Sequence, residues 1–468
     1  MMDDSLAKRA TGLAIACAIV LAALFAPPFG GLAREGMLAL GLLCGAVALW
    51  VCGTLPTGVT GLCATVLLFA LGAVDSFGEA FSGYTTLNVW FILAVFCMTA
   101  IMQRSSLGLR LARRLVDLAG ASSRRLVFAF MWVSAIVSTV MTDAGAAVVT
   151  MGIAVAVLNS LGVEKGRSNL GRCLLLGITF ASFIGGFATP VSHALNVVGS
   201  GLYQQATGQA VNFLEWTAVG VPLMFVMLPV TWFFLTRAFP PEEIDGATVR
   251  RAVDEAVSVG AWSAVDTKAL TFVIAMPAAW IASSFVPNAD PTVVTIIGLA
   301  LMFLPGIDLL DWKFFSGCVN WNVFLMLGGI MCLGNAIQST GCAEFFSSIF
   351  MGWGIMDMDP FAVMLLVAFA VYALQTVLPV APAFLTLLLP LLVPYAQAAG
   401  ISPLVPVLVM CSLLAGNFLL PLNPNSVVTY GEGYYSFTDM LRGGWAAAIV
   451  HVVAVVAASF AVTGLFWP

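Results

Sequence analysis

Asp143 is the only charged residue between Leu126 and Val163, and it lies close to the centre of that apolar stretch. A chargeable side chain at the middle of a bilayer costs on the order of 2.5 to 3.5 kcal/mol to insert, so it normally lines a cavity and has a function. A carboxylate there can bind a cation, carry a proton or contact a substrate. It can also cap a helix, since Thr142 and Asp143 precede an apolar helical run as an N-cap would.

An ionised Asp143 also restricts which substrates its site can accept. At about 4 Å from a substrate carboxylate, with an effective dielectric constant of 20, the repulsion is roughly 4 kcal/mol, or about three orders of magnitude in affinity. A bound sodium ion or a proton on the carboxyl group would remove this penalty. A substrate with no negative charge on that side would avoid it. Asp143 therefore either couples a cation to substrate binding or selects the substrate.

Further polar side chains occur in two interrupted apolar segments, 171–208 and 403–434. Amides at such interruptions satisfy free backbone groups and can also ligate sodium. A Gly-Gly pair either turns backbone carbonyls toward a cavity or allows tight helix packing. The candidates for ion coupling, besides Asp143, are Gly185, Gly186, Asn196, Asn417 and Asn425, and sodium is expected at Asp143, Asn196 and Asn425; the hydroxyls of Thr189 and Ser192, together with Asn423, are candidates for substrate binding.

The chain has only two histidines. His193 lies in the first interrupted segment and is either a neutral, hydrogen-bonded residue of a cavity or a functional group that faces an anion. If cationic, it could pair with Asp143. His451 lies in the last apolar run, where we expect a packed residue.

The elements that must position these residues are membrane helices. Of 468 residues, 61% are hydrophobic and 9% are charged, and apolar runs long enough to span a bilayer recur along the chain. The ten cysteines are scattered without a CxxC pair, so we expect small buried side chains rather than disulfides or a metal site. The net charge of −5 argues against a nucleic-acid partner. The composition predicts a polytopic membrane protein.

Charge distribution orients the chain. With Lys8 and Arg9 in the cytoplasm, most other Lys and Arg also fall inside, which predicts a multi-pass protein of the cytoplasmic (inner) membrane with a cytoplasmic N-terminus. This threading requires residues 126–163 to enter and leave on the same side. As one helix they would measure about 57 Å, against a hydrocarbon core of about 30 Å. The stretch is therefore predicted to be a re-entrant hairpin with Asp143 near its tip.

The second half of the chain repeats this plan. The segment LNVWFIL at Leu87–Leu93 is echoed by WNVFLML at Trp321–Leu327, and the two copies run in opposite directions. Inverted repeats with broken helices are the architecture of secondary transporters. The predicted fold is all-α, with about 11 transmembrane helices and two re-entrant hairpins. The first repeat covers 1–237 (hairpin 124–163, broken helix 171–208), a cytoplasmic linker that we expect to be a solvated connector covers 238–267, and the second repeat covers 268–468 (hairpin 360–395, broken helix 403–434).

Several segments resemble the divalent anion/sodium symporter family, in order and over nearly the whole chain. They include AFSGYTTLNVWFILA, ASFIGGFATP, WNVFLMLGGIMCLGNAIQSTG and GEGYYSFTDMLRGG. The resemblance implies a carrier of dicarboxylates, tricarboxylates or sulfate, with hairpin tips and broken helices enclosing the anion and sodium. It also implies a homodimer in which a scaffold and a moving transport domain, interleaved in sequence, give elevator-type alternating access.

The departures from the family are concentrated at the site. The Ser-Asn-Thr tips of the family's two hairpins correspond to Thr142, Asp143 and Ala144 in the first and to Val380, Ala381 and Pro382 in the second. The family's Gly-Ser/Thr-Pro-Pro-Asn segment corresponds to 192–196, and Asn425 is the match in the second broken helix. The resemblance thus implies substrate contacts at both tips, but one end of this pocket is polar and the other is apolar. This favours a monoanion, such as a carboxylate or sulfonate with an apolar tail, over a standard dicarboxylate.

We therefore expect a secondary transporter for a small organic anion, coupled to sodium or protons. One alternative is a cation/proton antiporter with Asp143 as the exchanging carboxylate, and another is a sensor built on a transporter frame. An enzyme is not expected, since no HExxH, GxSxG or P-loop motif occurs. No cofactor is expected besides sodium, and membrane lipids are the expected surroundings.

Overall fold

The computed structural model describes residues 2–119, 122–256, 260–286, 290–342, 345, 357–378 and 380–466. These residues form helices and connecting segments, with no β-strand among them. In chain order the helices are α1 (Met2–Phe25), α2 (Arg34–Cys52), α3 (Thr57–Ala70), α4 (Phe77–Ala80), η1 (Ser82–Thr85), α5 (Leu87–Arg104), α6 (Leu107–Ala119), α7 (Ser123–Ser138), α8 (Asp143–Ser160), α9 (Asn169–Ala188), α10 (Ala194–Thr207), α11 (Phe213–Ala238), α12 (Gly246–Ala256), α13 (Ala264–Ser283), α14 (Pro291–Met302), α15 (Trp312–Cys318), α16 (Trp321–Ser339), α18 (Pro360–Val377), α19 (Ala381–Ala398), α20 (Leu404–Ala415), α21 (Pro424–Gly431) and α22 (Phe437–Phe466).

Within the described residues, eleven helices are long and apolar enough to cross a membrane. The all-α, polytopic prediction is confirmed. The set of eleven differs from the predicted one in part, because it includes α8, α18 and α19, which we expected as hairpin arms. Conversely α3, α14 and α20 have only 14, 12 and 12 residues and fall short of a full span.

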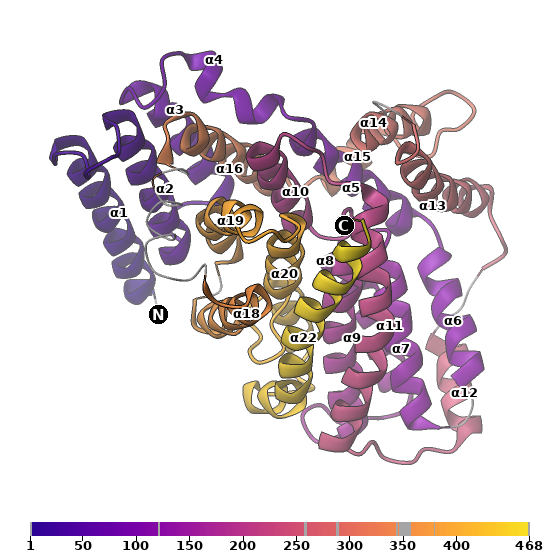
Figure 1. Cartoon of the computed structure of the whole chain (residues 1–468). Helices are drawn as coiled ribbons and strands as arrows, with labels where there is room; N and C mark the ends of the chain where they lie inside the picture. Colours follow the sequence, from indigo (N-terminus) through magenta and orange to yellow (C-terminus); the bar gives the residue numbers. More distant parts are fainter. Residues whose placement is uncertain are drawn as a thin grey trace.

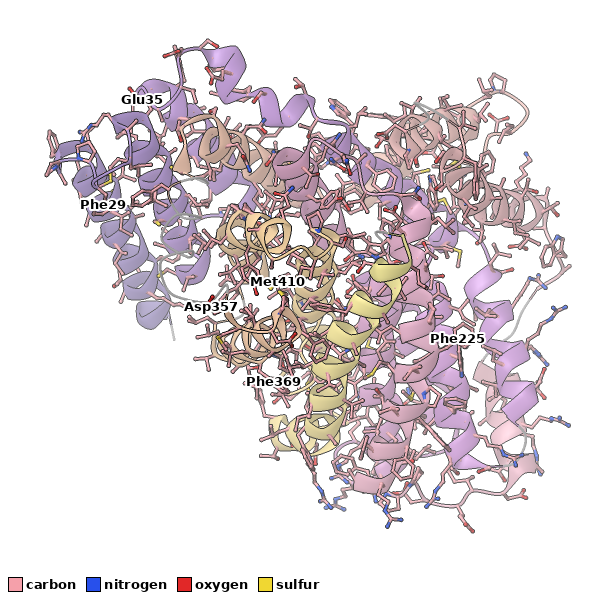
Figure 2. The ribbon with its side chains drawn as sticks, in the orientation of Figure 1. Phe29, Glu35, Phe225, Asp357, Phe369 and Met410 are labelled. Carbon is pink, nitrogen blue, oxygen red and sulfur yellow. The ribbon has the colours of Figure 1, made fainter. Side chains whose placement is uncertain are left out.

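The outer faces of the helices carry large apolar side chains, as expected of a surface in contact with lipid. Phe225 of α11 is 55% exposed and Phe369 of α18 is 39% exposed, whereas Met410 of α20 is fully buried (Figure 2). In Figure 1, α1 to α4 lie at one side of the molecule, α6, α7 and α12 lie at the other, and α10, α19 and α20 lie between them. Of the three helices that fall short of a full span, only α20 is almost fully buried, whereas α3 and α14 expose large apolar side chains such as Phe69 and Ile297.

Small residues allow α3 and α16 to approach closely. A Cβ atom at Gly61 would lie 3.4 Å from the Cα of Gly329, and Gly58 donates its N–H to the Asn322 side chain over 2.7 Å. Close backbone contact of this kind drives helix association where lipid removes the hydrophobic driving force. Asn322, from the repeated WNVFLML segment, therefore ties two helices together.

Two helices are broken where the sequence predicted interruptions. The first break separates α9 from α10 at 189–193 and contains Pro190, which cannot donate a helical hydrogen bond. The second separates α20 from α21 at 416–423, where Pro421 has the same effect, and Pro424 is the first residue of α21. Two turns join pairs of helices in a similar way: 139–142 joins α7 to α8, and the region around 378–380 joins α18 to α19.

The linker between the halves is more than a solvated connector, contrary to our expectation. Its helix α12 packs on α8, with Ala252 and Val253 only 3% and 2% exposed. Before α12, the carboxylate of Glu242 accepts the backbone N–H groups of Asn169 and Leu170 at the start of α9. The sequence signal for this packing was present, because Val249, Ala252, Val253 and Ala256 recur at the i, i+3, i+4 and i+7 spacing of an apolar helical stripe. The linker thus holds α8 and α9.

Candidate functional site

The first turn, between α7 and α8, presents Asp143 at the start of a helix. Thr142 is the N-cap of α8, since its hydroxyl accepts the N–H of Gly145 over 3.3 Å. The N–H of Thr142 in turn donates to the hydroxyl of Thr99 in α5, and the N–H of Asp143 donates to the carbonyl of Ser192 in the first break. The capping role that the sequence offered to Asp143 therefore falls to Thr142.

The Asp143 carboxylate, only 5% exposed, joins both broken helices. Its Oδ2 atom accepts a hydrogen bond of 2.7 Å from Nδ2 of Asn425, the second residue of α21. The same oxygen lies 3.5 Å from Nε2 of His193, the N-cap of α10. Three helices, α8, α10 and α21, thus begin around one carboxylate, and their N-termini carry partial positive charge. The structure brings together three residues that the sequence singled out separately.

The ring of His193 is held in one tautomer. Its Nδ1 accepts the backbone N–H of Leu195 over 3.0 Å, so the ring hydrogen must sit on Nε2, which faces Asp143. A doubly protonated ring would lose this bond, because both nitrogens would then donate. Of the two alternatives, this arrangement favours the neutral, hydrogen-bonded cavity residue.

Substitution can separate the role of His193 as the N-cap of α10 from its contact with Asp143. His193→Asn retains a side-chain acceptor that suits an N-cap, whereas His193→Ala removes it. We expect His193→Ala to lower the free energy of unfolding by about 1 kcal/mol more than His193→Asn, measured by denaturation of the purified protein. Equal losses for both His193 variants would contradict the capping role.

Hydroxyl and amide groups fill the rest of the first break. Asn196 is fully buried and donates from Nδ2 to the carbonyls of Gly186 and Thr189 over 2.8 and 2.9 Å. Its Oδ1 has no hydrogen-bond partner in the described part of the chain. The hydroxyls of Thr189 and Ser192 form a hydrogen bond with each other, and the one that accepts in that bond can donate to the carbonyl of Thr139 at the first turn. The first break thus contains one buried oxygen, Oδ1 of Asn196, that accepts no hydrogen bond from the described residues.

The Gly185-Gly186 pair allows close packing at this point. A Cβ atom at Gly185 would overlap the carbonyl of Ala135 in α7, and one at Gly186 would lie 2.9 Å from the Cβ of Asp143. Only glycine lets α9 approach the first turn so closely. The carbonyl of Gly186 accepts a hydrogen bond from Nδ2 of Asn196, so the structure shows the close packing, while the role of this pair in ion coupling remains a prediction.

The amides of the second break stabilise its own backbone. Asn417 accepts the N–H groups of Leu419 and Leu420 at Oδ1 and donates from Nδ2 to the hydroxyl of Thr376. Asn423 donates its N–H to the hydroxyl of Ser426 in the first turn of α21. Their expected roles in ion coupling and substrate binding remain predictions.

The second turn presents no polar side chain. Val380, Ala381 and Pro382 are half-buried at the start of α19, and Val380 is its N-cap without a side-chain hydrogen bond. Ala144 is likewise half-buried after Asp143. The contrast between a polar first turn and an apolar second turn that the sequence suggested is therefore present in the structure, while substrate contact at these positions remains a prediction.

Sequence reasoning missed several residues that hold the site. The hydroxyl of Ser182 in α9 lies 3.2 Å from Nδ2 of Asn425 and supports its contact with Asp143. On α18, Tyr372 contacts the backbone of the second break, and Gln375 contacts the carbonyls of Leu413 in α20 and Gly416 in the break. A lone amide in the apolar run AVYALQTV was the available signal for Gln375.

Comparison with known proteins shows to which protein family the chain belongs. Residues 7–467 match the family described as "Sodium:sulfate symporter transmembrane region". The chain belongs to this family. The resemblance of the sequence to divalent anion/sodium symporters is thereby confirmed, and the family consists of membrane transporters, not enzymes.

Relatives within this family are distant but cover most of the chain. Sodium-dependent dicarboxylate transporter SdcS of Staphylococcus aureus (strain bovine RF122 / ET3-1) is 23% identical over 453 residues, which cover 90% of this chain and 85% of that protein. SdcS of Staphylococcus saprophyticus is 23% identical over 454 residues, covering 91% and 86%. The fold is similar to that of the YdaH transporter of Alcanivorax borkumensis, with a TM-score of 0.59, 14% identity, and coverage of 84% and 87%.

Proposed function

We propose that the chain is a secondary transporter that carries a small organic anion across the cytoplasmic membrane together with sodium. The observation that carries this proposal is the buried Asp143 carboxylate, around which α8, α10 and α21 begin. Short helices that start near the midplane hold substrates and coupling ions in secondary transporters. Sodium coupling is also supported by the family and by the names of the relatives.

Sodium is proposed to bind next to Asp143, with oxygen atoms of Asn196 and Asn425 as further ligands. Hard cations prefer carboxylate and carbonyl oxygens. The buried Oδ1 of Asn196 has no partner in the described residues, and such an unsatisfied atom costs about 1–3 kcal/mol. A cation would satisfy this atom and neutralise Asp143. Gly185, Gly186 and Asn417 complete the proposed surroundings of the ion. A proton on Asp143 is the alternative coupling ion.

The anion is proposed to lie between the two turns. The polar side supplies amide, imidazole and hydroxyl groups, whereas the second turn supplies an apolar wall. This combination suits a monoanion with an apolar tail better than a dicarboxylate, which needs a polar partner at each end. The proposed lining consists of Thr142, Asp143, Ala144, Thr189, Ser192, His193, Val380, Ala381, Pro382 and Asn423.

Movement of the site is proposed to follow the elevator scheme that the resemblance implies. The two hairpins and two broken helices would form the moving part of each protomer in a homodimer. The proposed inverted repeats (1–237 and 268–468) and the cytoplasmic linker (238–267) would place the N-terminus in the cytoplasm.

A ligand screen of the purified protein tests this function. Thermal unfolding would be followed with monocarboxylates, sulfonates, dicarboxylates and sulfate, each in sodium and in choline buffer. A ligand at a hundredfold excess over its dissociation constant adds about 2.7 kcal/mol to the free energy of unfolding. We expect stabilisation by a monoanion with an apolar tail, in sodium only, and saturable uptake of that anion by proteoliposomes.

Two other results would contradict parts of this proposal. Saturable, sodium-dependent uptake of succinate would contradict the monoanion but leave the sodium symporter. Stabilisation by no anion, together with mutual dissipation of sodium and proton gradients, would favour the cation/proton antiporter.

A further inference from the structure

The helix α21 depends on its neighbours for its position. It has only eight residues, and helices shorter than about 12 residues are marginal in isolation. It packs against α8 and α9. Asn425 in its first turn donates to Asp143 over 2.7 Å, and such a bond tolerates donor–acceptor distances only up to about 3.2 Å. The contact with Asp143 therefore requires α21 to be held at one place along α9.

Two polar contacts join α21 to α9 inside the protein. Nδ2 of Asn425 lies 3.2 Å from Oγ of Ser182. One helical turn further along α21, Oγ1 of Thr429 lies 2.6 Å from Oγ1 of Thr179. The two residues from each helix are three or four positions apart and so share one face of that helix. All four side chains are at most 3% exposed, so water does not compete for these bonds.

The hydroxyl group of Thr429 connects α9 with the segment that follows α21. Besides Thr179, it contacts the hydroxyl of Tyr435 over 2.8 Å. A hydroxyl carries one donor and two acceptor sites, so Thr429 can bond both neighbours at once. Thr179 also lies 2.8 Å from the carbonyl of Leu175. Tyr435 lies 3.1 Å from the carbonyl of Ser426. Removal of the Thr429 hydroxyl would therefore leave neither neighbour without an acceptor.

We infer that Thr179 and Thr429 are positioning residues of the proposed cation site, because their hydrogen bond sets the place of α21 along α9 and so holds Asn425 against Asp143. This inference rests on the proposed function, in which Asp143 and Asn425 bind the coupling ion. Neither threonine is among the proposed ligands, and each bonds to hydroxyl and backbone groups instead. They therefore act on the ion only through Asn425.

Thr429→Val tests the inference in the purified full-length protein. Valine nearly keeps the shape of threonine and removes the hydroxyl, so α21 should be held less tightly. We expect the dissociation constant for sodium to rise about fivefold, the effect of one typical hydrogen bond. It is measured from thermal unfolding in a sodium titration balanced with choline, without organic anion. An unchanged dissociation constant in folded Thr429→Val overturns the inference. If this variant does not fold, Thr179→Val breaks the same bond from α9 and is judged by the same criterion.

Thr429→Ser and Thr150→Val are the matched controls. Thr429→Ser keeps the hydroxyl but loses a buried methyl group, so the protein should be less stable and yet bind sodium as the wild type does. Thr150 is fully buried in α8, the helix that begins at Asp143, and its hydroxyl has no partner in the described residues. Thr150→Val should therefore leave the dissociation constant unchanged. A rise in Thr429→Ser as large as in Thr429→Val would mean that packing determines the affinity, and would also overturn the inference.

A double-mutant cycle tests the inference without any sodium. In choline buffer, Asp143→Ala should lower the free energy of unfolding more in the wild type than in Thr429→Val, because the bond between Asp143 and Asn425 is already weakened in the variant. Thr429 and Asp143 share no hydrogen bond in the described part of the chain. Equal losses are therefore expected if no link runs through Asn425, and they would overturn the inference.

The two measurements separate the inference from the proposed function. If the wild type shows no stabilisation by sodium, the proposed sodium coupling fails, and the double-mutant cycle alone decides the role of Thr179 and Thr429. If sodium stabilises the wild type and Thr429→Val binds it equally well, the proposed function stands and the inference fails.

Discussion

Asp143→Asn is expected to abolish the sodium requirement for anion binding while leaving the fold intact. The carboxamide keeps an acceptor for Nδ2 of Asn425 but removes the negative charge. At about 4 Å and an effective dielectric constant of 20, a carboxylate attracts a sodium ion by roughly 4 kcal/mol. The affinity for sodium should therefore fall on the order of 10³-fold. Thermal unfolding of the purified protein in a sodium titration, followed by uptake measurements in proteoliposomes, checks this.

Asp290→Asn is the matched control. Asp290 is the N-cap of α14, where its side chain accepts the N–H of Thr292, and asparagine caps a helix as well as aspartate does. This variant should retain the wild-type affinity for sodium. If Asp143→Asn also retained it, Asp143 would be a structural partner of Asn425 and not a coupling residue.

Gly444→Val is expected to cause the largest loss of stability. A Cβ atom at Gly444, in α22, would overlap the carbonyl oxygen of Phe418 in the second break and would lie 3.0 Å from the ring of Phe180. Overpacking of a filled interior typically costs 1–3 kcal/mol, and here one of the overlapping atoms belongs to buried backbone. We expect a loss of about 3 kcal/mol or a failure to fold, measured as the yield and thermal unfolding of purified protein.

Gly464→Val controls for the change in helix propensity. Gly464 lies in the same helix, and a Cβ atom there would meet no heavy atom of the described residues within 4 Å. This variant should purify and unfold as the wild type does. A folded Gly444→Val protein of wild-type stability would mean that the second break can shift away from α22 without cost.

The general architecture could be predicted from local features of the sequence. Hydropathy predicted most of the helices and both interrupted segments, because the cost of burying a polar or charged side chain in a membrane is large and is set mainly by the residue type. The same reasoning singled out Asp143, a lone carboxylate in an apolar stretch. The distant relatives cover the chain at only 23% identity, so family membership adds the class of transporter but little about the pocket.

The contacts of the site could not be predicted in this way. Asn425 donates to Asp143 across 282 residues of sequence, and Gln375 reaches the end of α20 from another helix. In neither pair does the hydrophobic periodicity of one segment indicate that it contacts the other. The tautomer of His193 depends on a single backbone N–H, that of Leu195.

The sequence by itself thus determined that the chain is a bundle of membrane helices with one buried carboxylate near a turn. Only the tertiary structure decided which groups satisfy that carboxylate and which carbonyls at the breaks already have donors. Hydropathy is a property of each residue and survives in any arrangement of the helices. A hydrogen bond, by contrast, requires a donor within about 3 Å of its acceptor, and that distance is set by the packing of helices that lie far apart in the sequence.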